Sequence, residues 1–166
     1  MHAESLALME KHLHHIPFPL LSKTRFPPSV LDVGSRNING DYRALCNGLG
    51  MSYTGLDTEP GVNVDIVSKP YSFPISEYFD LVICGNMLHN VEKPWLLIPE
   101  MVRVLRPGGL LVVVTIWKWG INSYPVDYFR YSDNGLRSLF DEAGCLGDYE
   151  TEMDDLGNTA GSAIKR

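Results

Sequence analysis

One stretch of this chain, residues 79–116, restricts the possible folds more than any other. It contains an apolar run at Leu81–Cys84, a helix-like segment that ends near Leu105, and a second apolar run at Leu110–Ile116. The tetrapeptide Arg106-Pro107-Gly108-Gly109 stands before the second run as a stop signal. A strand, a crossover helix and a second strand form a βαβ unit, and strands this uniformly apolar are typical of a parallel sheet covered on both faces. The stretch therefore predicts an α/β fold.

Ligands of such sheets bind beyond the carboxyl ends of the strands. Gly85, Asn86 and Met87 follow the first apolar run directly, so we expect them to face a pocket. The helix after them contains Pro94 and Pro99. Because a proline inside a helix removes a hydrogen bond, we predict a kink, or a helix that begins near Pro99.

The remaining elements follow from apolar periodicity and from caps. Short links at 58–62 and 68–78, the second with two prolines, predict that two crossover helices are missing. The other predicted helices are a leading helix at Ala3–His15 ended by Pro17 and Pro19, a helix opened by Asn39-Gly40-Asp41, and a helix capped by Ser132. The other predicted strands are Val30–Val33, Ser52–Leu56, Asn63–Val67, Tyr149–Met153 and Thr159–Lys165.

Composition limits the function classes. With 166 residues we expect one domain, comprising a leading helix and loop at 1–28 and a core at 30–166. The net charge of −6 argues against a nucleic-acid partner, and no apolar run approaches the length of a membrane span. Cys46, Cys84 and Cys145 are scattered, which favours reduced thiols in the cytoplasm over disulfides or zinc. His12 and His15 lack acidic or cysteine neighbours, so we interpret them as solvated and expect no metal.

The block at 79–116 resembles the second half of class I S-adenosylmethionine-dependent methyltransferases. In that family an L-[KR]-P-G-G turn precedes the fifth strand, as Leu105–Gly109 does here, and a Met-Leu-His segment such as Met87–His89 follows the fourth. The resemblance spans about Val30–Gly144. It implies a Rossmann-like three-layer sandwich with a seven-stranded, mostly parallel sheet, and S-adenosyl-L-methionine as the cofactor.

Two positions carry the predicted cofactor site. Gly34 ends the first strand, where only a residue without a Cβ lets a ligand approach closely. Asp57 ends the second strand 23 residues later, about the spacing at which a carboxylate meets a ribose. Alternatively, Gly34 is a simple turn and Asp57 a solvated loop end. By the resemblance, we also assign cofactor contacts to Asp32, Ser35, Arg36, Thr58, Ser68, Gly85, Asn86 and Met87.

The glycine loop departs from the family pattern of an acidic residue followed by Gly-x-Gly-x-Gly. Arg36 replaces the second glycine, and the loop also fails the G-x-G-x-x-G of dinucleotide enzymes. Arg36 could pair with the methionine carboxylate of the cofactor, or form a salt bridge with Asp32 or Asp57. Asn37 and Asn39 could supply the left-handed conformations of the missing glycines.

A second departure lies at Ser68-Lys69, where the family commonly places an acid that contacts the adenine amino group. A lysine cannot accept that hydrogen bond. The Ser68 hydroxyl or backbone groups could take over, or cofactor affinity is reduced.

Methyl transfer needs a positioned acceptor and, for a hydroxyl acceptor, a general base. His89 and Asp127 are the candidates. Asp127 belongs to an aromatic loop at 117–131 in which Pro125, Asp127, Tyr128 and Arg130 resemble a Pro-x-Asp-Tyr-x-Arg pattern of related enzymes. His89 could instead pack against the next helix, and Asp127 could instead form an ion pair with Arg130.

We therefore predict a methyltransferase that acts on a small-molecule or sugar-like acceptor. The alternatives are a non-catalytic protein that keeps the fold as a binding partner and, less favoured, an NAD(P)-dependent oxidoreductase, which lacks its dinucleotide loop here. The apolar residues of the 117–131 loop would suit a homodimer equally well.

Overall fold

The computed structural model describes residues 3–14, 27–123, 125–144 and 146–166. The described residues therefore do not include His15, Pro17, Pro19 or Cys145. In chain order the elements are α1 (Ala3–His14), β1 (Ser29–Val33), α3 (Arg43–Gly48), β2 (Ser52–Asp57), β3 (Ile66–Val67), β4 (Phe79–Gly85), the 3-10 turn η1 (Leu88–Asn90), α4 (Pro94–Val104), β5 (Leu105–Ile116), α5 (Asp133–Glu142), β6 (Leu146–Met153) and β7 (Asn158–Lys165).

The strands form one seven-stranded sheet in the order β3-β2-β1-β4-β5-β7-β6. The five strands from β3 to β5 pair in parallel, whereas β7 runs antiparallel to both β5 and β6. The predicted seven-stranded, mostly parallel sheet is confirmed. From β1 the chain first builds outward through β2 and β3 and then returns to the other side of β1 with β4, so the strand order reverses between β1 and β4.

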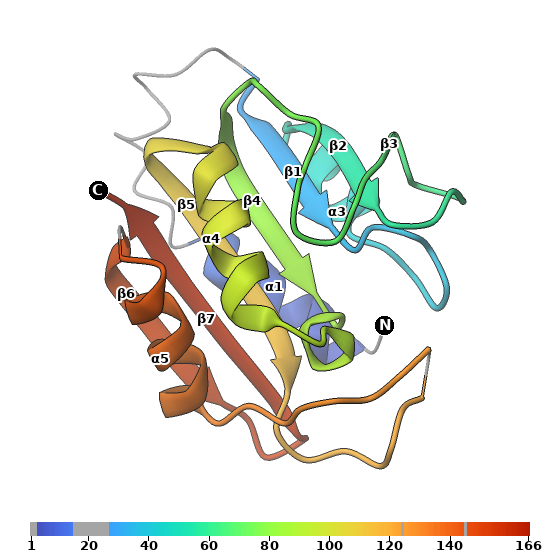
Figure 1. Cartoon of the computed structure of the whole chain (residues 1–166), viewed down its shortest axis with the longest axis vertical. Coiled ribbons are helices and arrows are strands. Elements are labelled where there is room, and N and C mark those ends of the chain that lie inside the picture. The colour runs from blue at the N-terminus through green and yellow to red at the C-terminus, as the bar shows by residue number, and fades with distance from the viewer. Residues whose placement is uncertain (1–2, 15–26, 124, 145) are drawn as a thin grey trace.

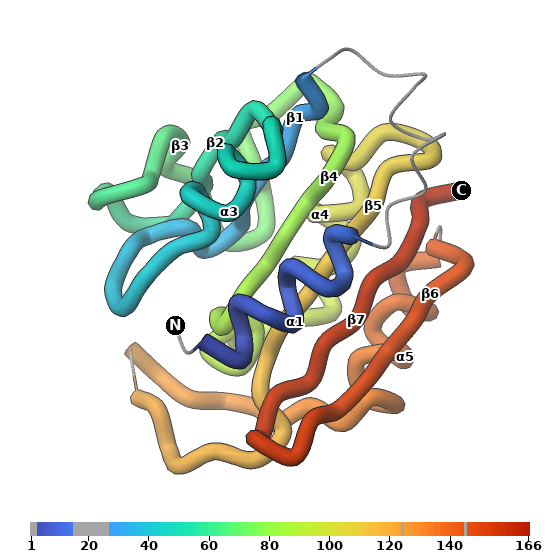
Figure 2. The backbone as a smooth tube through the Cα atoms, turned by 180° about the vertical axis from the view of Figure 1, so that it is seen from behind, coloured from blue at the N-terminus to red at the C-terminus, as the bar shows by residue number. Residues whose placement is uncertain are grey.

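Helices cover both faces of the sheet. Figure 1 shows α4 and α5 in front of the sheet, and Figure 2 shows α1 and α3 on the opposite face. Each face has its own apolar core, because successive side chains of a strand point to opposite sides. In β4, Val82 and Cys84 join the core under α4 and α5, while Leu81 and Ile83 join the core under α1. The predicted three-layer sandwich is confirmed.

Helix α1 is fastened to the last two strands. The Ser5 hydroxyl donates to Asn158 Oδ1 at 3.0 Å, and Lys11 Nζ lies 2.6 Å from Glu152 Oε2. The ring of His12 lies between Ser162 Oγ, 2.9 Å from Nδ1, and Glu152 Oε1, 3.0 Å from Nε2. The prediction that His12 is solvated is therefore wrong. It is buried because β6 and β7 extend the sheet beneath this side of the helix.

The two predicted links without helices are confirmed, since residues 58–65 and 68–78 contain no helix. Strand β3 has only two residues instead of the predicted five. It pairs on one side only, with Leu56 and Asp57 of β2, so it is a short edge strand. Helix α3 is also shorter than predicted, and Tyr42 just before it is buried.

Helix α4 begins at Pro94 and continues past Pro99, so the predicted start near Pro99 is wrong, and the alternative of a kink at Pro99 stays a prediction. The missing N–H of Pro99 would have bonded the carbonyl of Trp95, a residue that is half exposed. Water can satisfy a carbonyl on that side of the helix, which reduces the cost of the proline. At α5 the prediction holds, because the Ser132 hydroxyl accepts a hydrogen bond from Gly135 N at 3.1 Å.

The tetrapeptide at 106–109 lies within the bounds of β5 but interrupts its pairing. The register passes from Phe79 opposite Leu105 to Leu81 opposite Leu110, so these four residues bulge out. Gly108 adopts φ +77°, and a Cβ on Gly109 would lie 2.9 Å from the carbonyl oxygen of Asp80. Both glycines are therefore required where β4 meets the start of β5.

Among the described helices, none has the length and apolar character needed to cross a membrane.

Candidate active site

A cavity of about 870 Å³ lies at the carboxyl edge of the sheet, beyond the ends of β2, β1, β4 and β5. Its centre is the reversal point between β1 and β4, where open α/β sheets bind their ligands. In Figure 1 the arrowheads of β1, β4 and β5 point toward this edge. All of the predicted site residues except Asp127 line the cavity: Asp32, Gly34, Ser35, Arg36, Asp57, Thr58, Ser68, Gly85, Asn86, Met87 and His89.

The turn after β1 is held by backbone hydrogen bonds from Gly34 N and Ser35 N to Leu56 O, at 2.8 and 3.1 Å. Gly34 adopts φ +84°, and a Cβ at this position would lie 2.7 Å from Met87 Cγ. No other residue fits here without displacing the turn that follows β4. The Ser35 hydroxyl donates to the carbonyl of Asn63 at 3.1 Å, so it helps to fix the turn.

In the rest of the glycine loop, the side chain of Asn37 bonds its neighbours, and Gly40 is the residue with a positive φ. Asn37 and Asn39 are not among the residues with positive φ, so the expectation that they replace glycines is wrong. Instead, Asn37 Oδ1 accepts from Gly40 N at 2.9 Å and Asn37 Nδ2 donates to Asp41 Oδ2 at 2.6 Å. Gly40, with φ +115°, supplies the unusual conformation.

The Asp57 carboxylate accepts hydrogen bonds from the backbone N–H groups of Arg36 and Glu59, each at 3.1 Å. These bonds orient it at the mouth of the cavity. The Thr58 hydroxyl also lies 3.5 Å from Asp57 Oδ1. A carboxylate has about four lone-pair sites, so one remains for a ligand, and a second becomes available when the Thr58 hydroxyl rotates to another acceptor. Such a group can bind a vicinal diol.

Arg36 forms no ion pair with Asp32 or Asp57 among the described contacts, so the salt-bridge alternative is wrong. Its backbone, not its guanidinium, contacts Asp57. The aliphatic stem packs against Gly61, where a Cβ would lie 2.8 Å from Arg36 Cγ. The guanidinium borders the cavity and is available for an anionic group of a ligand.

Asp32 lies at the base of the cavity and is buried. Tyr53 donates a hydrogen bond to Asp32 Oδ2 at 2.5 Å. Burial raises the pKa of this carboxyl to about 7, although the bond from Tyr53 opposes the shift. Near neutral pH the site therefore holds a carboxyl group that gains its charge readily when a cation binds beside it.

Tyr42 was not predicted as a site residue. Its ring lies against Gly85, where a Cβ would come within 2.1 Å of the ring, and its hydroxyl accepts from Asn86 Nδ2 at 3.3 Å. Asn86 adopts φ +56°, which turns the chain away from β4. The sequence pattern placed Tyr42 on the apolar face of a helix, and only the pairing of β1 with β4 brings it to Gly85.

Ser68 lines the cavity, whereas Lys69 is not among the lining residues. The Ser68 hydroxyl donates to the carbonyl of Lys69 at 3.1 Å, and its lone pairs remain free to accept. Lys69 therefore supplies no hydrogen-bond acceptor to the cavity, whereas the Ser68 hydroxyl can.

His89 is only 2% exposed and borders the opposite side of the cavity. Its Nε2 lies 3.2 Å from Asn122 Nδ2, and its Nδ1 has no hydrogen-bond partner. Burial lowers the pKa of this imidazole to about 4, so the ring is neutral at neutral pH. A neutral imidazole carries one N–H donor and one lone pair, and Asn122 can bond only one of its nitrogens.

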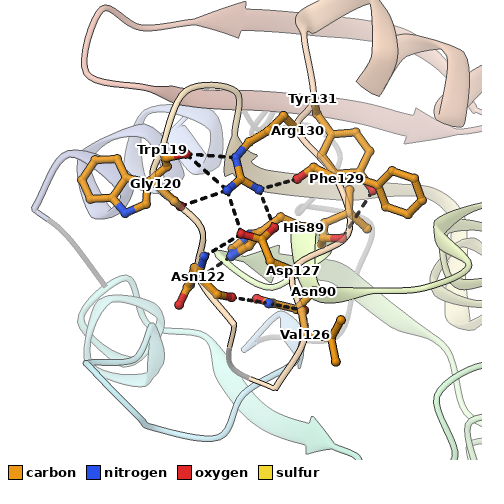
Figure 3. A network of polar contacts seen from close by, with 11 residues as sticks. His89, Asn90, Trp119, Gly120, Asn122, Val126, Asp127, Phe129, Arg130 and Tyr131 are labelled. Atoms are coloured by element: carbon orange, nitrogen blue, oxygen red, sulfur yellow. Dashed lines mark hydrogen bonds and ion pairs between the residues drawn. The ribbon is translucent and has the colours of Figure 1, made fainter.

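The 117–131 loop is held against η1 by the polar network drawn in Figure 3. Arg130 donates to both carboxylate oxygens of Asp127, at 2.5 and 2.7 Å, and to the carbonyl oxygens of Gly120 and Phe129. Asn90 Nδ2 donates to the carbonyls of Asn122 and Val126 at 3.1 and 2.6 Å. The network fixes the described residues of this loop, 117–123 and 125–131, none of which belongs to a helix or strand.

Asp127 does not fit the role of general base. Its side chain is only 3% exposed, and the Asn122 N–H bonds one of its oxygens at 2.6 Å in addition to Arg130. The Arg130 guanidinium holds the pKa of this carboxyl well below its usual range. A carboxylate with so little affinity for a proton is a poor base. The ion-pair alternative is confirmed, and of the two candidates only His89 reaches the cavity.

The comparisons with known proteins agree with this architecture. The sequence profile of the methyltransferase domain matches residues 31–113, half of the chain. An uncharacterized methyltransferase of Mycolicibacterium gilvum is 30% identical over 103 residues, and another, from Mycobacterium sp. strain JLS, is 33% identical over 104. Each match covers 54% of this chain and 40% or 39% of the relative, so the chain matches less than half the length of either.

Among solved structures, a Burkholderia thailandensis N-methyltransferase with bound 1,6-didemethyltoxoflavin and S-adenosylhomocysteine superposes with a TM-score of 0.71. It is 16% identical, and the match covers 98% of this chain and 77% of that chain. A SAM-dependent methyltransferase from Aquifex aeolicus gives a TM-score of 0.66 at 17% identity and covers both chains completely. At these identities the likeness concerns the fold alone.

Proposed function

Because this chain belongs to the class I S-adenosylmethionine-dependent methyltransferases, we propose that it transfers the methyl group of S-adenosylmethionine to a small-molecule acceptor. One observation supports the proposal above all others. Residues that the sequence pattern singled out after β1, after β2, at Ser68 and after β4 line a single cavity at the reversal point of the sheet.

The cofactor site occupies the side of the cavity formed by β1 and β2. Asp57 binds the two ribose hydroxyls with its remaining lone pairs, and Gly34 lets the ligand approach the backbone. Arg36 pairs with the carboxylate of the methionine part, since its guanidinium has no described partner. Asp32, with its raised pKa, loses its proton beside the positive charge of the ligand. Ser68 accepts from the adenine amino group. The residues present therefore fit this cofactor.

When bound, the cofactor supplies a methyl group already activated by the positive charge on sulfur. The protein holds the acceptor in line with it. The cofactor would supply the methyl carbon to a lone pair of the acceptor oxygen or nitrogen and would keep the electrons of its carbon–sulfur bond on sulfur. The acceptor proton would pass to water, or to His89 if the bound acceptor reaches the buried Nδ1 and that nitrogen holds the lone pair of the neutral ring.

The free, buried thiols of Cys46 and Cys84 support our expectation of a reducing compartment, the cytoplasm.

Titration calorimetry with S-adenosylmethionine, S-adenosylhomocysteine and NAD tests the proposal. We expect micromolar binding of the first two and none of NAD. A radiolabelled methyl donor and a pool of small metabolites then test for transfer. Cofactor binding with no transfer to any acceptor would favour a non-catalytic binding protein, whereas binding of NAD alone would favour an oxidoreductase.

A further inference from the structure

The side of the cavity opposite Asp57 is bordered by apolar side chains that face water. Trp119, Val126 and Tyr128 of the 117–131 loop are 48%, 45% and 43% exposed, and Ile38 of the glycine loop is 47% exposed. All four line the cavity. Large apolar side chains gathered around a concave site mark a surface that binds an apolar partner.

Beyond the ends of β4 and β5, the polar lining residues are the acidic Glu92, the imidazole of His89, which is neutral at neutral pH, and the amides of Asn90, Asn122 and Asn158. The Asn90 amide already bonds the loop backbone, and Nδ1 of His89 is buried. Asn122 Oδ1 has no described partner, which leaves the Asn122 amide as a group that can orient a ligand. The guanidinium of Arg130 is not available, because it bonds Asp127 and loop carbonyls and does not line the cavity.

The charge of the cavity is unfavourable for anions. Among the described lining residues, Arg36 is the only lysine or arginine, and it lies on the Asp57 side. Five lining residues are acidic: Asp32, Asp41, Asp57, Glu59 and Glu92. An anionic ligand on the loop side would lose its hydration without gaining a cation and would face this negative charge.

We propose that the acceptor is a flat, largely apolar molecule without a phosphate or carboxylate group, such as a phenol or an aryl amine. This inference rests on the proposed function, since it concerns the second ligand of the same cavity. Trp119 and Tyr128 offer aromatic faces on which a planar ring can stack.

Three matched probes test the inference: 1-naphthol, 1-naphthylamine and 1-naphthyl phosphate, titrated into the full chain saturated with S-adenosylhomocysteine at pH 7.5. The phosphate keeps the ring and adds up to two negative charges. We expect both neutral probes to bind at least tenfold more tightly than 1-naphthyl phosphate. Equal or tighter binding of the phosphate would overturn the inference.

The variant Trp119→Ala should weaken 1-naphthol binding at least fivefold while S-adenosylhomocysteine binds as before. Tyr78→Ala is the control, because Tyr78 is an exposed aromatic residue that does not line the cavity, whereas the ring of Trp95 contacts Phe129 of the 117–131 loop. It should change naphthol affinity less than twofold. An equal effect of both variants on 1-naphthol affinity would overturn the inference, because the binding would then be non-specific. A Trp119→Ala variant that changes only the sedimentation coefficient would also overturn it and would assign these apolar side chains to a dimer interface.

The two proposals fail separately. Loss of S-adenosylhomocysteine binding in the wild-type chain counts against the proposed function. Normal S-adenosylhomocysteine binding with a preference for the phosphate probe counts only against the aryl acceptor.

Discussion

The two sides of the cavity are built in different ways. On the Asp57 side, ligand-facing groups lie one or two residues beyond buried parallel strands, and backbone hydrogen bonds such as Gly34 N to Leu56 O fix them. On the loop side, the described residues of 117–131 form no helix or strand. Backbone bonds from Tyr128 N and Phe129 N to His89 O hold them, together with the side chains of Asn90, Asp127 and Arg130. The first side therefore inherits the stability of the sheet, whereas the second depends to a larger extent on side-chain contacts that a single substitution removes.

The largest expected effect is that of Arg130→Met. The substitution leaves the Asp127 carboxylate, whose side chain is 3% exposed, without its cation. Removing one partner of a buried ion pair typically lowers the free energy of unfolding by roughly 3–5 kcal/mol. Because only a thin layer of protein covers this pair, we expect a loss near the lower end of that range. Native-state hydrogen exchange measures it. The amides of Tyr128 and Phe129, which donate to His89 O, should exchange roughly 100-fold faster.

The amides of Gly34 and Ser35 serve as the internal control for Arg130→Met and should keep their protection. The double variant Asp127→Asn/Arg130→Met should recover part of the loss, because no unpaired charge remains. Equal loss of protection on both sides of the cavity would refute the contrast between them.

Asp57→Ala should have the next largest effect, now on the other side. We expect S-adenosylhomocysteine affinity to fall by about 1–3 kcal/mol, because a hydrogen-bonded carboxylate is lost from the site. The amides of Arg36 and Glu59 should also exchange faster, since they donate to Asp57. Calorimetry provides the affinity, and Glu59→Gln, a change at a neighbouring lining residue, should alter it less than threefold. Unchanged affinity of Asp57→Ala would remove Asp57 from the cofactor site.

His89 should make stability depend on pH. Its pKa in the folded protein is about 4, below the ordinary value of 6.5, so the unfolded chain takes up the proton first as the pH falls. Stability from this group is complete above about pH 6.5 and is lost as the pH falls toward 4. We expect a loss of about 1–2 kcal/mol between pH 7 and pH 5.

Chemical denaturation of wild type and His89→Gln at both pH values measures this contribution. The variant should lose less stability on acidification than the wild type. His14→Gln, which removes an exposed imidazole from α1, should behave like the wild type. Identical pH dependence of all three proteins would contradict the lowered pKa of His89.

The smallest expected effect is that of Asn122→Ala, which removes the only described partner of His89 Nε2. We expect a cost of about 0.5–1.5 kcal/mol. If the amide donates to the lone pair of Nε2, it favours the neutral ring, and its loss should raise the pKa of His89. Imidazole chemical shifts against pH measure this directly. A lower pKa in the variant would mean that Nε2 carries the proton and that Nδ1 holds the free lone pair.

Sequence patterns predicted the Asp57 side far better than the loop side. Gly34 and Asp57 were found because strand ends are marked by apolar runs and a glycine, signals that lie within a few residues. Asp127 and Arg130 were also paired in advance, since three residues separate them. Asn90 and Asn122 were not found, because the bonds of their side chains join segments about 30 residues apart. The burial of His12 was missed for the same reason, since strands some 140 residues later cover it.

The fastening of α1 to β6 and β7 has a consequence for how the chain reaches its fold. The described partners of Ser5, Lys11 and His12 lie 140 or more residues away, so these contacts cannot reward early ordering of the helix. A ribosome releases residues 3–14 first, yet their binding surface is complete only after the last strand has emerged. We therefore expect this helix to dock late in folding, after the parallel strands have paired. Its amides should gain protection last in pulse-labelled refolding, and for this segment the order of synthesis is the reverse of the order of assembly.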